Sequence, residues 1–523
     1  MRKSIFILII CFIAFLVACA NNEAPSFTED LPAFGSLGEE TNVAQEVFEL
    51  AATPRLHKNI GITMPHTLNP LLNTDPSLSP LFSLLFEPLV IFNEEMRPIA
   101  NPAITESIVL SPQATSVTIT LRANIFWEDG TPITANDIAF SIGVLTNNAS
   151  VHSLYRQNIA NIASYTILNS NSIVLNLHQP MGYIKYFLNF PIISAEYYGL
   201  ANMNQPTAAR NMHPIGNGQF RFLSHTQARH IDLVANGMAA AGAPIEQTAR
   251  AIILRDAESQ LFAFEQGIID RVEASPALSG RFVAAGFVRE RDFIGNEFTF
   301  LGFNFGLPEM QNLDLRRAIA HSLDVNGILA ADAQLAGRTT APINPLSWLY
   351  NQDLAGFDFD LGLAASIFDS MGYILVDNMR IRQLGPGLPP SVLQIVILVN
   401  EESESRIRIA QNLAQNLASL GVGYSLSILP FNDYLAAIEG GAYTVFVGSV
   451  QLPDAPSLGF LHSSSAGFAS YQSHILDMQI DLIRLASNEL TMTHAVSAFQ
   501  EYILYNLPIF GIGFNVNAVF SAP

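Results

Sequence analysis

The sequence predicts a mixed α/β protein, and three stretches of the chain support that prediction. Residues 115–121 alternate polar and apolar side chains, which is the period of a half-buried strand. Residues 393–399 form a continuous apolar run, which is typical of a strand covered on both faces. The segment after that run repeats isoleucine and leucine at helical spacing and ends at Gly421, as an amphipathic helix with a C-terminal glycine does. Strands and helices alternate in this way in α/β lobes.

Further elements are expected along the chain. Thr134 should cap a helix, with Asp137 three residues on, and Asp314 should cap a later one. Residues 219–223 and 230–234 should pair as a β-hairpin. Residues 424–429 should form the strand that follows the helix ending at Gly421.

Five conspicuous side chains have structural interpretations. We expect Trp127 to lie in the core. We expect Arg316 and Arg317 to form pairs at the surface or at a helix end. His225 and His230 flank the turn of the predicted hairpin, and we expect both to face solvent.

The composition allows a large folded body and excludes several classes of protein. At 523 residues the chain has room for about three or four domains. Hydrophobic residues make up 49% and charged residues 13%, so the body is not intrinsically disordered. The 25 basic and 45 acidic side chains give a net charge of −20, which argues against nucleic-acid binding. The two cysteines, Cys11 and Cys19, lie near the N-terminus, so we expect no disulfide framework in the body.

The first nineteen residues have the pattern of a secretory signal. Two basic residues precede an apolar run over residues 5–18, which is too short for an ordinary membrane span. The run ends in Leu-Val-Ala-Cys, which resembles a bacterial lipobox, so we expect Cys19 to be lipidated. The alternative is an ordinary signal peptide with Cys19 incidental. Residues 20–54 contain acidic but no basic residues, and we expect a flexible tether there, or a short helix over residues 43–51.

Short motifs then follow one another in a fixed order. Residues 125–138 combine an aromatic residue, an acidic Glu-Asp-Gly turn and a capped helix. The other motifs are Phe-Glu-Pro-Leu-Val at 86–90, Pro-Ile-Gly-Asn-Gly-Gln-Phe at 214–220, Asp-Leu-Val-Ala-Asn at 232–236, Gln-Gly-Ile-Ile-Asp at 266–270, Leu-Asp-Leu-Arg-Arg-Ala-Ile at 313–319, and an Asp-capped helix ending in Gly-Tyr at 360–373. Together they resemble the bacterial extracellular solute-binding proteins of the oligopeptide, dipeptide and nickel class, the receptors of ABC importers. Pro88 stands where that class has glycine.

The resemblance implies a two-lobed α/β fold like that of periplasmic binding proteins of type II, in the large class with an extra subdomain in lobe I. Two crossing strands join the lobes, which close on a ligand like a hinge. The implied boundaries are a signal peptide at 1–19, a tether at 20–54, lobe I at 55–296 with the extra subdomain at about 90–209, lobe II at 297–506, and a return to lobe I at 507–523.

The resemblance also implies one side of a ligand cleft. In peptide-binding members of the family an extended peptide pairs its backbone with strands of the cleft, which gives affinity without sequence preference. The matching stretch of this chain holds Thr74, Asp75 and Pro76. Pro76 has no N–H group, so it cannot donate to a peptide carbonyl.

On the other side of the cleft, peptide-binding members of the family bind the α-amine of the peptide with an aspartate in a Gly-Trp-x-x-Asp stretch. Here Ser449 replaces the tryptophan, Gln451 follows, and Leu452 replaces the aspartate. Asp454, two residues later, is either the amine ligand or an ordinary turn residue. A buried ammonium without a carboxylate would be costly, so this departure bears on the kind of ligand.

No catalytic or metal-binding motif is evident. The 11 histidines are scattered without metal-ligand spacing, and the chain has no Gly-x-Ser-x-Gly and no phosphate-binding glycine loop. We therefore expect neither an enzyme nor a bound metal or cofactor. Trp348 and Tyr350 either line a ligand pocket or pack in the core.

The implied function is that of a lipid-anchored receptor on the extracytoplasmic face of the cell membrane. It would act as a monomer, capture a peptide-like ligand between its lobes and deliver it to an ABC permease and ATPase. The alternatives are a signalling receptor of the same fold, a receptor for another solute such as an oligosaccharide or a metal chelate, and an enzyme on this scaffold.

Overall fold

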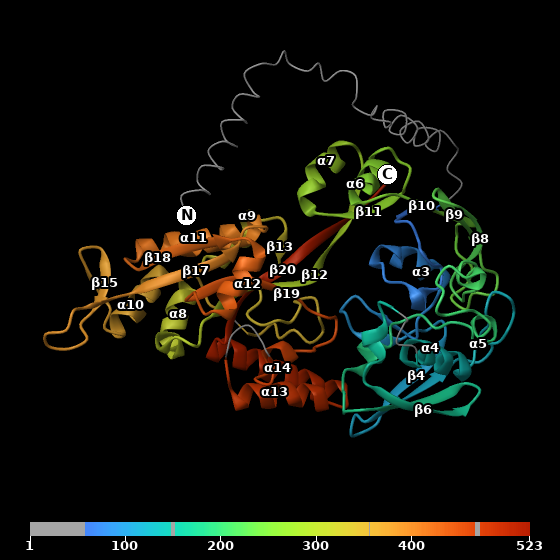
Figure 1. Cartoon of the computed structure of the whole chain (residues 1–523), viewed down its shortest axis with the longest axis horizontal. Coiled ribbons are helices and arrows are strands. Elements are labelled where there is room, and N and C mark those ends of the chain that lie inside the picture. The colour runs from blue at the N-terminus through green and yellow to red at the C-terminus, as the bar shows by residue number, and fades with distance from the viewer. Residues whose placement is uncertain (1–57, 148–151, 355, 466–470, 523) are drawn as a thin grey trace, which may run out of the picture. The chain divides into compact units, whose positions relative to one another are not determined.

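The computed structural model describes residues 58–522 except 148–151, 355 and 466–470. The predicted signal sequence, the lipidation of Cys19 and the tether therefore lie outside the described residues. Within the described part of the chain, the strands form five sheets, and helices connect and cover them (Figure 1). The mixed α/β architecture predicted from the hydrophobic pattern is confirmed.

The first four-stranded sheet contains the predicted hairpin. β1 (Lys58–Ile62) runs parallel to β10 (Thr248–Ile253), which pairs antiparallel with β9 (His230–Ala235). β8 (Phe220–Thr226) completes the sheet by pairing with β9. The hairpin is confirmed, but the expectation that His225 and His230 face solvent is wrong. Both side chains are partly buried because they lie within the paired strands rather than in the turn.

A second four-stranded sheet has the order β4-β5-β7-β6. Its strands are β4 (Thr105–Leu110), β5 (Ser116–Leu121), β6 (Ile162–Asn169) and β7 (Ser172–Leu177). The strand predicted from alternation over residues 115–121 is thus confirmed. α4 (Ala135–Asn147) packs against β6 and β7, and Trp127 is 1% exposed, as expected for a core residue.

The start of α4 differs in detail from the predicted reciprocal cap. Asp137 accepts hydrogen bonds from the Thr134 backbone N–H at 2.7 Å and from the Thr134 hydroxyl at 3.2 Å. The hydroxyl therefore donates to the carboxylate instead of capping the helix itself. The other carboxylate oxygen of Asp137 accepts from Ala195 N–H at 2.7 Å, which ties α4 to α5 (Ala195–Tyr198).

The longest strands belong to a seven-stranded sheet with the path β11-β20-β12-β19-β17-β18. β12 (Val288–Phe303) and β20 (Ile509–Ser521) pair antiparallel over most of their length (Figure 1). β11 (Arg271–Ala274) pairs with the last residues of β20, whereas β19 (Val445–Gln451) pairs with the last residues of β12. β12 and β20 therefore connect the two ends of this sheet.

The apolar run of residues 393–399 becomes β17 (Gln394–Asn400), which lies parallel to β18 (Gly423–Leu429) and β19. α11 (Glu404–Ser419) contacts all three strands, which explains why β17 has so few polar residues. Gly421 follows α11 with φ +76°, a conformation that glycine adopts without strain. The predicted strand–helix–strand order is confirmed.

The pairing of β12 with β20 contains a large bulge. Ile294 lies opposite Val516 and Phe298 opposite Phe514, so residues 295–297 face Asn515 alone. The Asn515 side chain accepts from Glu297 N–H at 2.9 Å. A Cβ atom on Gly295 would lie 2.4 Å from the Asn515 Oδ1 atom, so any other residue here would displace the Asn515 side chain from its hydrogen bond to Glu297.

The start of α8 (Leu313–His321) corrects one expectation and decides between the two alternatives of another. The helix is capped by Asn312, whose side chain accepts from Asp314 N–H at 2.8 Å, so Asp314 lies in the first turn. Arg316 is 4% exposed and is not a surface residue. It donates to the Leu507 carbonyl at 3.0 Å and to the Asn506 carbonyl at 2.9 Å, so it satisfies the end of α14 (Glu489–Asn506), as a helix-end arginine does.

Arg317 fits its expectation better, since it is partly exposed and pairs with Asp314 at 3.5 Å. Asp360 caps α10 (Leu361–Ser370) as predicted, by accepting from Leu363 N–H. The remaining elements are α3 (Ser79–Leu85), β2 (Val90–Phe92), β3 (Pro98–Ala100), α6 (Ala257–Glu265), α7 (Ser279–Ala284), α9 (Val325–Ala331), β13 (Leu335–Ala336), β14 (Ile374–Val376), β15 (Met379–Arg382), β16 (Ser391–Val392), α12 (Phe431–Glu439), α13 (His474–Leu485) and the 3-10 helices η1 (Pro70–Leu72), η2 (Pro76–Leu78), η3 (Arg156–Ile159), η4 (Ile184–Phe187), η5 (Ala209–Asn211), η6 (Pro276–Leu278), η7 (Pro308–Gln311) and η8 (Gly459–Leu461).

The buried apolar residues form three clusters. One is drawn from residues 62–251 and a second from residues 301–512. The third brings Tyr183 and Tyr186 together with residues between 298 and 514. Side chains far apart in the sequence therefore meet in this third cluster, and the candidate site lies there.

Candidate functional site

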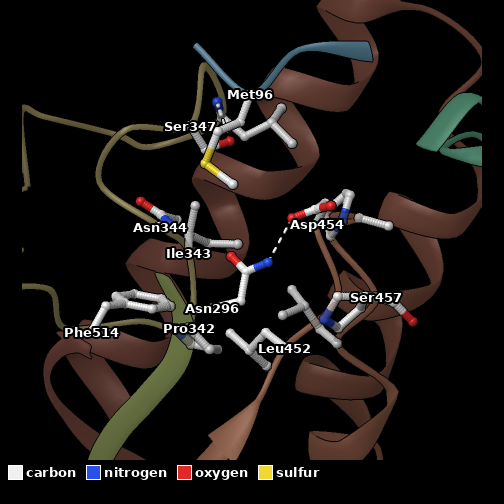
Figure 2. A pocket seen from close by; sticks show the side chains of 15 residues that line it. Met96, Asn296, Pro342, Ile343, Asn344, Ser347, Leu452, Asp454, Ser457 and Phe514 are labelled. Atoms are coloured by element: carbon white, nitrogen blue, oxygen red, sulfur yellow. Dashed lines mark hydrogen bonds between the residues drawn. The ribbon is translucent and has the colours of Figure 1, made fainter. Parts of the chain in front are cut away.

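A small pocket brings together segments that are distant in sequence. Met96, Asn296 on the β12 bulge, Asn344, Ser347 and the loop after β19 line it (Figure 2). Its cavity volume is about 30 Å³, the share of space that one water molecule occupies in the liquid. The pocket therefore has room for one small chemical group but not for a whole ligand.

The loop after β19 supplies the acidic side of the pocket. Leu452 N–H donates to the Asn296 carbonyl at 2.9 Å, which extends the pairing of β19 with β12 by one residue. Pro453 then ends the ladder, because proline has no N–H group to donate. Asp454 follows on the exposed side of this turn, and it accepts from the Asn296 side chain at 2.6 Å (Figure 2).

Asp454 is the one ionisable side chain among the residues that line the pocket. It has no other hydrogen-bond partner in the described part of the chain. A carboxylate accepts about four hydrogen bonds, so Asp454 keeps most of its capacity for a ligand. A lone carboxylate beside amide side chains suits a cation that donates hydrogen bonds, such as an ammonium group.

The charge of Asp454 also reaches Tyr186. Burial raises the pKa of Tyr186 to about 12, and the Asp454 carboxylate adds to that rise. The hydrogen bond from Trp348 and the charge of Arg97 oppose it. Tyr186 therefore lies within electrostatic reach of Asp454 and stays a neutral hydroxyl at physiological pH.

Other residues proposed from the sequence for this side of the cleft do not line the pocket. Ser449 donates to the Glu297 carboxylate at 2.6 Å and accepts a hydrogen bond from the guanidinium of Arg406. Gln451 lies opposite Glu297 in the ladder and is exposed. Of the four candidates in this stretch, the structure brings Leu452 and Asp454 into the pocket, while Ser449 and Gln451 lie on the strand before it.

Trp348 and Tyr350 lie beside the pocket rather than in its lining. The Trp348 indole N–H donates to the Tyr186 hydroxyl at 2.9 Å. The Tyr350 hydroxyl donates to the Arg338 carbonyl at 3.3 Å. Both rings pack against the third core cluster, and Trp348 also lines a second cavity, so packing alone describes Tyr350 but not Trp348.

The stretch proposed as a cleft strand is not a strand. Asp75 accepts from Ser77 N–H at 2.9 Å and thereby caps the 3-10 helix η2, which starts at Pro76. An Asp-Pro-Ser sequence favours this capped turn, because proline fits the first position of a helix. Thr74 and Asp75 do not line the Asp454 pocket, and Pro76 lines a separate cavity of about 750 Å³ between α3, β11 and β12. Pro76 and Asp454 therefore line different cavities.

No sequence motif indicates Met96, Asn296 or Asn344, and Ser347 is singled out only as the neighbour of Trp348. Asn344 donates to the Gly295 carbonyl at 3.1 Å, and Asn296 reaches Asp454 across 158 residues of sequence. Such contacts depend on the pairing of β12 with β19, which has no local signal in the sequence. In the described residues, no group of three or more histidine, cysteine, aspartate or glutamate side chains is arranged to hold a metal ion.

Comparisons with known proteins show what the chain is similar to. A sequence model described as "Bacterial extracellular solute-binding proteins, family 5 Middle" matches residues 100–472, more than half of the chain. An ABC transporter peptide-binding protein of Brucella ovis is 26% identical over 305 residues. That alignment covers 56% of this chain and 56% of the relative, so little more than half of the relative is matched.

Two solved structures show a likeness in fold. HbpA2 from Haemophilus parasuis aligns with a TM-score of 0.74 at 18% identity, covering 89% of this chain and 95% of the other. The ABC transporter substrate-binding protein CtaP from Listeria monocytogenes aligns with a TM-score of 0.70 at 18% identity, covering 89% and 93%. The predicted fold class, an α/β two-lobed fold like that of periplasmic binding proteins, is confirmed. Within the residues that the structure describes, none of the helices combines the length and apolar character needed to span a bilayer.

Proposed function

Because the chain belongs to the bacterial extracellular solute-binding proteins of family 5, we propose that it captures a peptide-like solute and delivers it to the permease of an ABC transporter. Its role in this proposal is binding and release rather than catalysis. The relative from Brucella ovis is named as an ABC transporter peptide-binding protein, which agrees with that role. Another relative, from Haemophilus influenzae, is named as a haem-binding protein, so the ligand itself must be tested.

The observation that carries the peptide-like part of this proposal is the Asp454 pocket. Its single carboxylate, with most of its hydrogen-bonding capacity unused, suits the α-amine of a peptide. Taking an ammonium out of water is costly unless a carboxylate meets it. In this proposal Asp454 supplies that carboxylate two residues after Leu452, whose backbone N–H donates to the Asn296 carbonyl.

The arrangement of the chain in this proposal follows the boundaries given above. Lobe I comprises residues 55–296, with its extra subdomain at about 90–209, and residues 507–523; lobe II comprises residues 297–506. The bulge at residues 295–297 of β12 supports this division, since it interrupts the pairing of the two long strands at the boundary. Cys19 would carry the lipid that holds the protein, as a monomer, on the extracytoplasmic face of the membrane.

Native mass spectrometry of the mature chain as purified tests the nature of the ligand. The mass under native conditions is compared with the mass after denaturation. A retained mass that fragments as a peptide ladder is the expected result. A retained oligosaccharide or metal chelate would overturn the peptide-like ligand and explain why the family's aspartate position holds Leu452.

A second experiment distinguishes a transport role from a signalling role. The ligand-loaded chain should stimulate ATP hydrolysis by an ABC permease complex from the same cell, reconstituted in vesicles. Ligand binding without any such stimulation would contradict delivery and would favour a signalling receptor of the same fold. Release of the protein from membranes in a Cys19→Ala variant would support the lipid anchor, whereas continued membrane association of this variant would contradict it.

A further inference from the structure

A second cavity lies next to the Asp454 pocket and shares no lining residue with it. It has a volume of about 300 Å³, ten times that of the Asp454 pocket. Its walls come from β3 and β4, from η4 and the residues before it, from Trp348, and from the start of α14. Ser347 and Leu349, on either side of Trp348, line the Asp454 pocket instead, so Trp348 belongs to the partition between the two cavities.

Most of the second cavity is apolar and aromatic. Ile108 and Leu110 of β4 and Met492 of α14 supply aliphatic surface, and Tyr183, Tyr186 and Trp348 supply rings. The indole of Trp348 is fixed by its hydrogen bond to Tyr186 at 2.9 Å. Cavities of about 300 Å³ with such walls and a few polar groups are typical of sites for small organic molecules.

Two cationic side chains line this cavity, in a chain whose net charge is −20. Lys185 is one of three lysines in the sequence, and its ammonium makes no ion pair or hydrogen bond within the described residues. Arg97 lies over the Trp348 ring at 4.5 Å and pairs with Glu489 at 3.0 Å. Its Nε atom is buried and has no hydrogen-bond partner in the described part of the chain.

Glu489 is the one acidic residue of the lining, against two cationic ones, while Glu95, which pairs with Arg97 at 3.6 Å, lies outside the lining. An unpaired ammonium and a buried, unsatisfied N–H group are both stabilised by an anion. We propose that this cavity binds a small organic anion with an apolar body, with Lys185 and Arg97 meeting its carboxylate and the aromatic walls enclosing the rest. Its ligand thus differs in charge from the cation expected beside Asp454, and the proposal does not depend on the transport role.

Occupancy of this cavity would also join two parts of the chain. Its lining residues come from two parts of the chain: Arg97 and residues 182–186 belong to one, and Trp348 with the residues at the α13–α14 connection belongs to the other. Direct links across it are few: Trp348 N–H to the Glu95 carbonyl at 2.9 Å, Gly182 N–H to the Arg484 carbonyl at 2.7 Å, the Trp348–Tyr186 hydrogen bond and the Arg97–Glu489 pair. A ligand that contacts both sides adds to these links and stabilises them by mass action.

The test uses 4-fluorobenzoate with the full chain, observed by ¹⁹F nuclear magnetic resonance. The matched probes 4-fluorobenzylamine and 4-fluorobenzyl alcohol have the same ring with a positive and a neutral group. We expect line broadening and saturable binding for the benzoate, and at least tenfold weaker binding for the other two. Equal binding of the amine or the alcohol would overturn the proposal.

Four variants locate the bound probe. Lys185→Met should weaken benzoate binding by about tenfold or more, and Lys185→Arg should retain it. Arg317→Met removes the same charge from an exposed pair with Asp314 and should leave binding unchanged. Asp454→Asn should not weaken it, because the two cavities share no residue and the variant removes a negative charge. Unchanged binding in a folded Lys185→Met protein, or loss of binding in Asp454→Asn, would place the probe elsewhere and overturn the proposal; thermal unfolding curves establish that each variant is folded.

Discussion

Two aspartates show how differently the same side chain is used in two regions of this chain. Asp137, at the start of α4, is 4% exposed and accepts three hydrogen bonds, two from Thr134 and one from Ala195. Asp454, in the loop after β19, is exposed and accepts one hydrogen bond, from Asn296, within the described chain. Asp137 has almost no capacity left for a ligand, whereas Asp454 has most of its capacity.

This difference explains why the most recognisable motif of the sequence is not the functional site. The residues around Trp127 and Asp137 are restricted by packing and by hydrogen bonds to their own chain. A side chain in such a place specifies the fold. The loop around Asp454 makes few bonds of its own, so its sequence can change with the ligand without loss of the fold.

The largest effect expected from this comparison is on stability. Asp137→Ala should lower the free energy of unfolding by about 2–4 kcal/mol, because the Thr134 and Ala195 donors lose their acceptor in a buried place. Urea unfolding measures the change. Asp129→Ala is the matched control, since Asp129 lies in the exposed turn of the same motif and accepts from Thr131 alone. Equal costs for the two variants would contradict the structural role of Asp137.

At Asp454 we expect the opposite pattern, with a large effect on ligand affinity and none on stability. Asp454→Asn should leave the unfolding midpoint unchanged and weaken the ligand identified by mass spectrometry by about 10- to 100-fold, because a charged hydrogen bond contributes about 1.5–3 kcal/mol. Isothermal titration calorimetry measures the affinity. Asp129→Asn, again in the exposed turn, should bind normally. If Asp454→Asn retains full affinity, Asp454 is a turn residue and the amine is bound elsewhere.

The region around Trp127 and the Asp454 loop should also differ in how their stability responds to pH, because the first contains Glu128. Burial raises the pKa of Glu128, next to Trp127, to about 7 from its ordinary value of 4.5, although the hydrogen bond from Gly216 N–H and the charge of Arg221 oppose the rise. The folded state therefore binds the proton more tightly than the unfolded state does. The stability that this proton contributes is complete below about pH 4.5 and is lost as the pH rises through about 7.

Glu128→Gln tests this pH dependence. Glutamine keeps an acceptor for Gly216 N–H and does not ionise, so the variant should lose less stability than the natural chain as the pH rises through about 7. Urea unfolding midpoints over this range give the slope. If stability changes equally with pH in the variant and the natural chain, Glu128 has the same pKa in the folded and unfolded states.

The smallest expected effect is at the residue that holds Asp454. Asn296→Ala removes the hydrogen bond at 2.6 Å and leaves the Asp454 charge in place. We expect ligand affinity to fall by about threefold, since an ordinary hydrogen bond contributes about 0.5–1.5 kcal/mol. Isothermal titration calorimetry on Asn296→Ala and Asp454→Asn gives the loss of ligand affinity in each variant and hence their ratio. A loss as large as that of Asp454→Asn would mean that Asn296 contacts the ligand itself.

Local chemistry was enough to predict much of the fold. The β8–β9 hairpin, β5, and the order β17, α11, β18 follow from alternation, from helical spacing and from Gly421, all of which act between residues close in sequence. The errors were also local. Asn312 and Asp314 both suit a helix start, and a pattern alone does not decide between two neighbouring caps. The Asp-Pro pair at residues 75–76 caps a 3-10 helix instead of continuing a strand.

The sequence by itself determined the family motifs, the α/β class and the loop in which Asp454 lies. Tertiary structure alone decided that Asn296, Asn344 and Met96 meet Asp454, that Trp348 faces a different cavity, and that Arg316 is buried at the end of α14. The physical reason is that caps, turns and amphipathic faces depend on neighbours within a few residues. The candidate site depends on the register of β12 against β19 and β20, which joins segments more than a hundred residues apart.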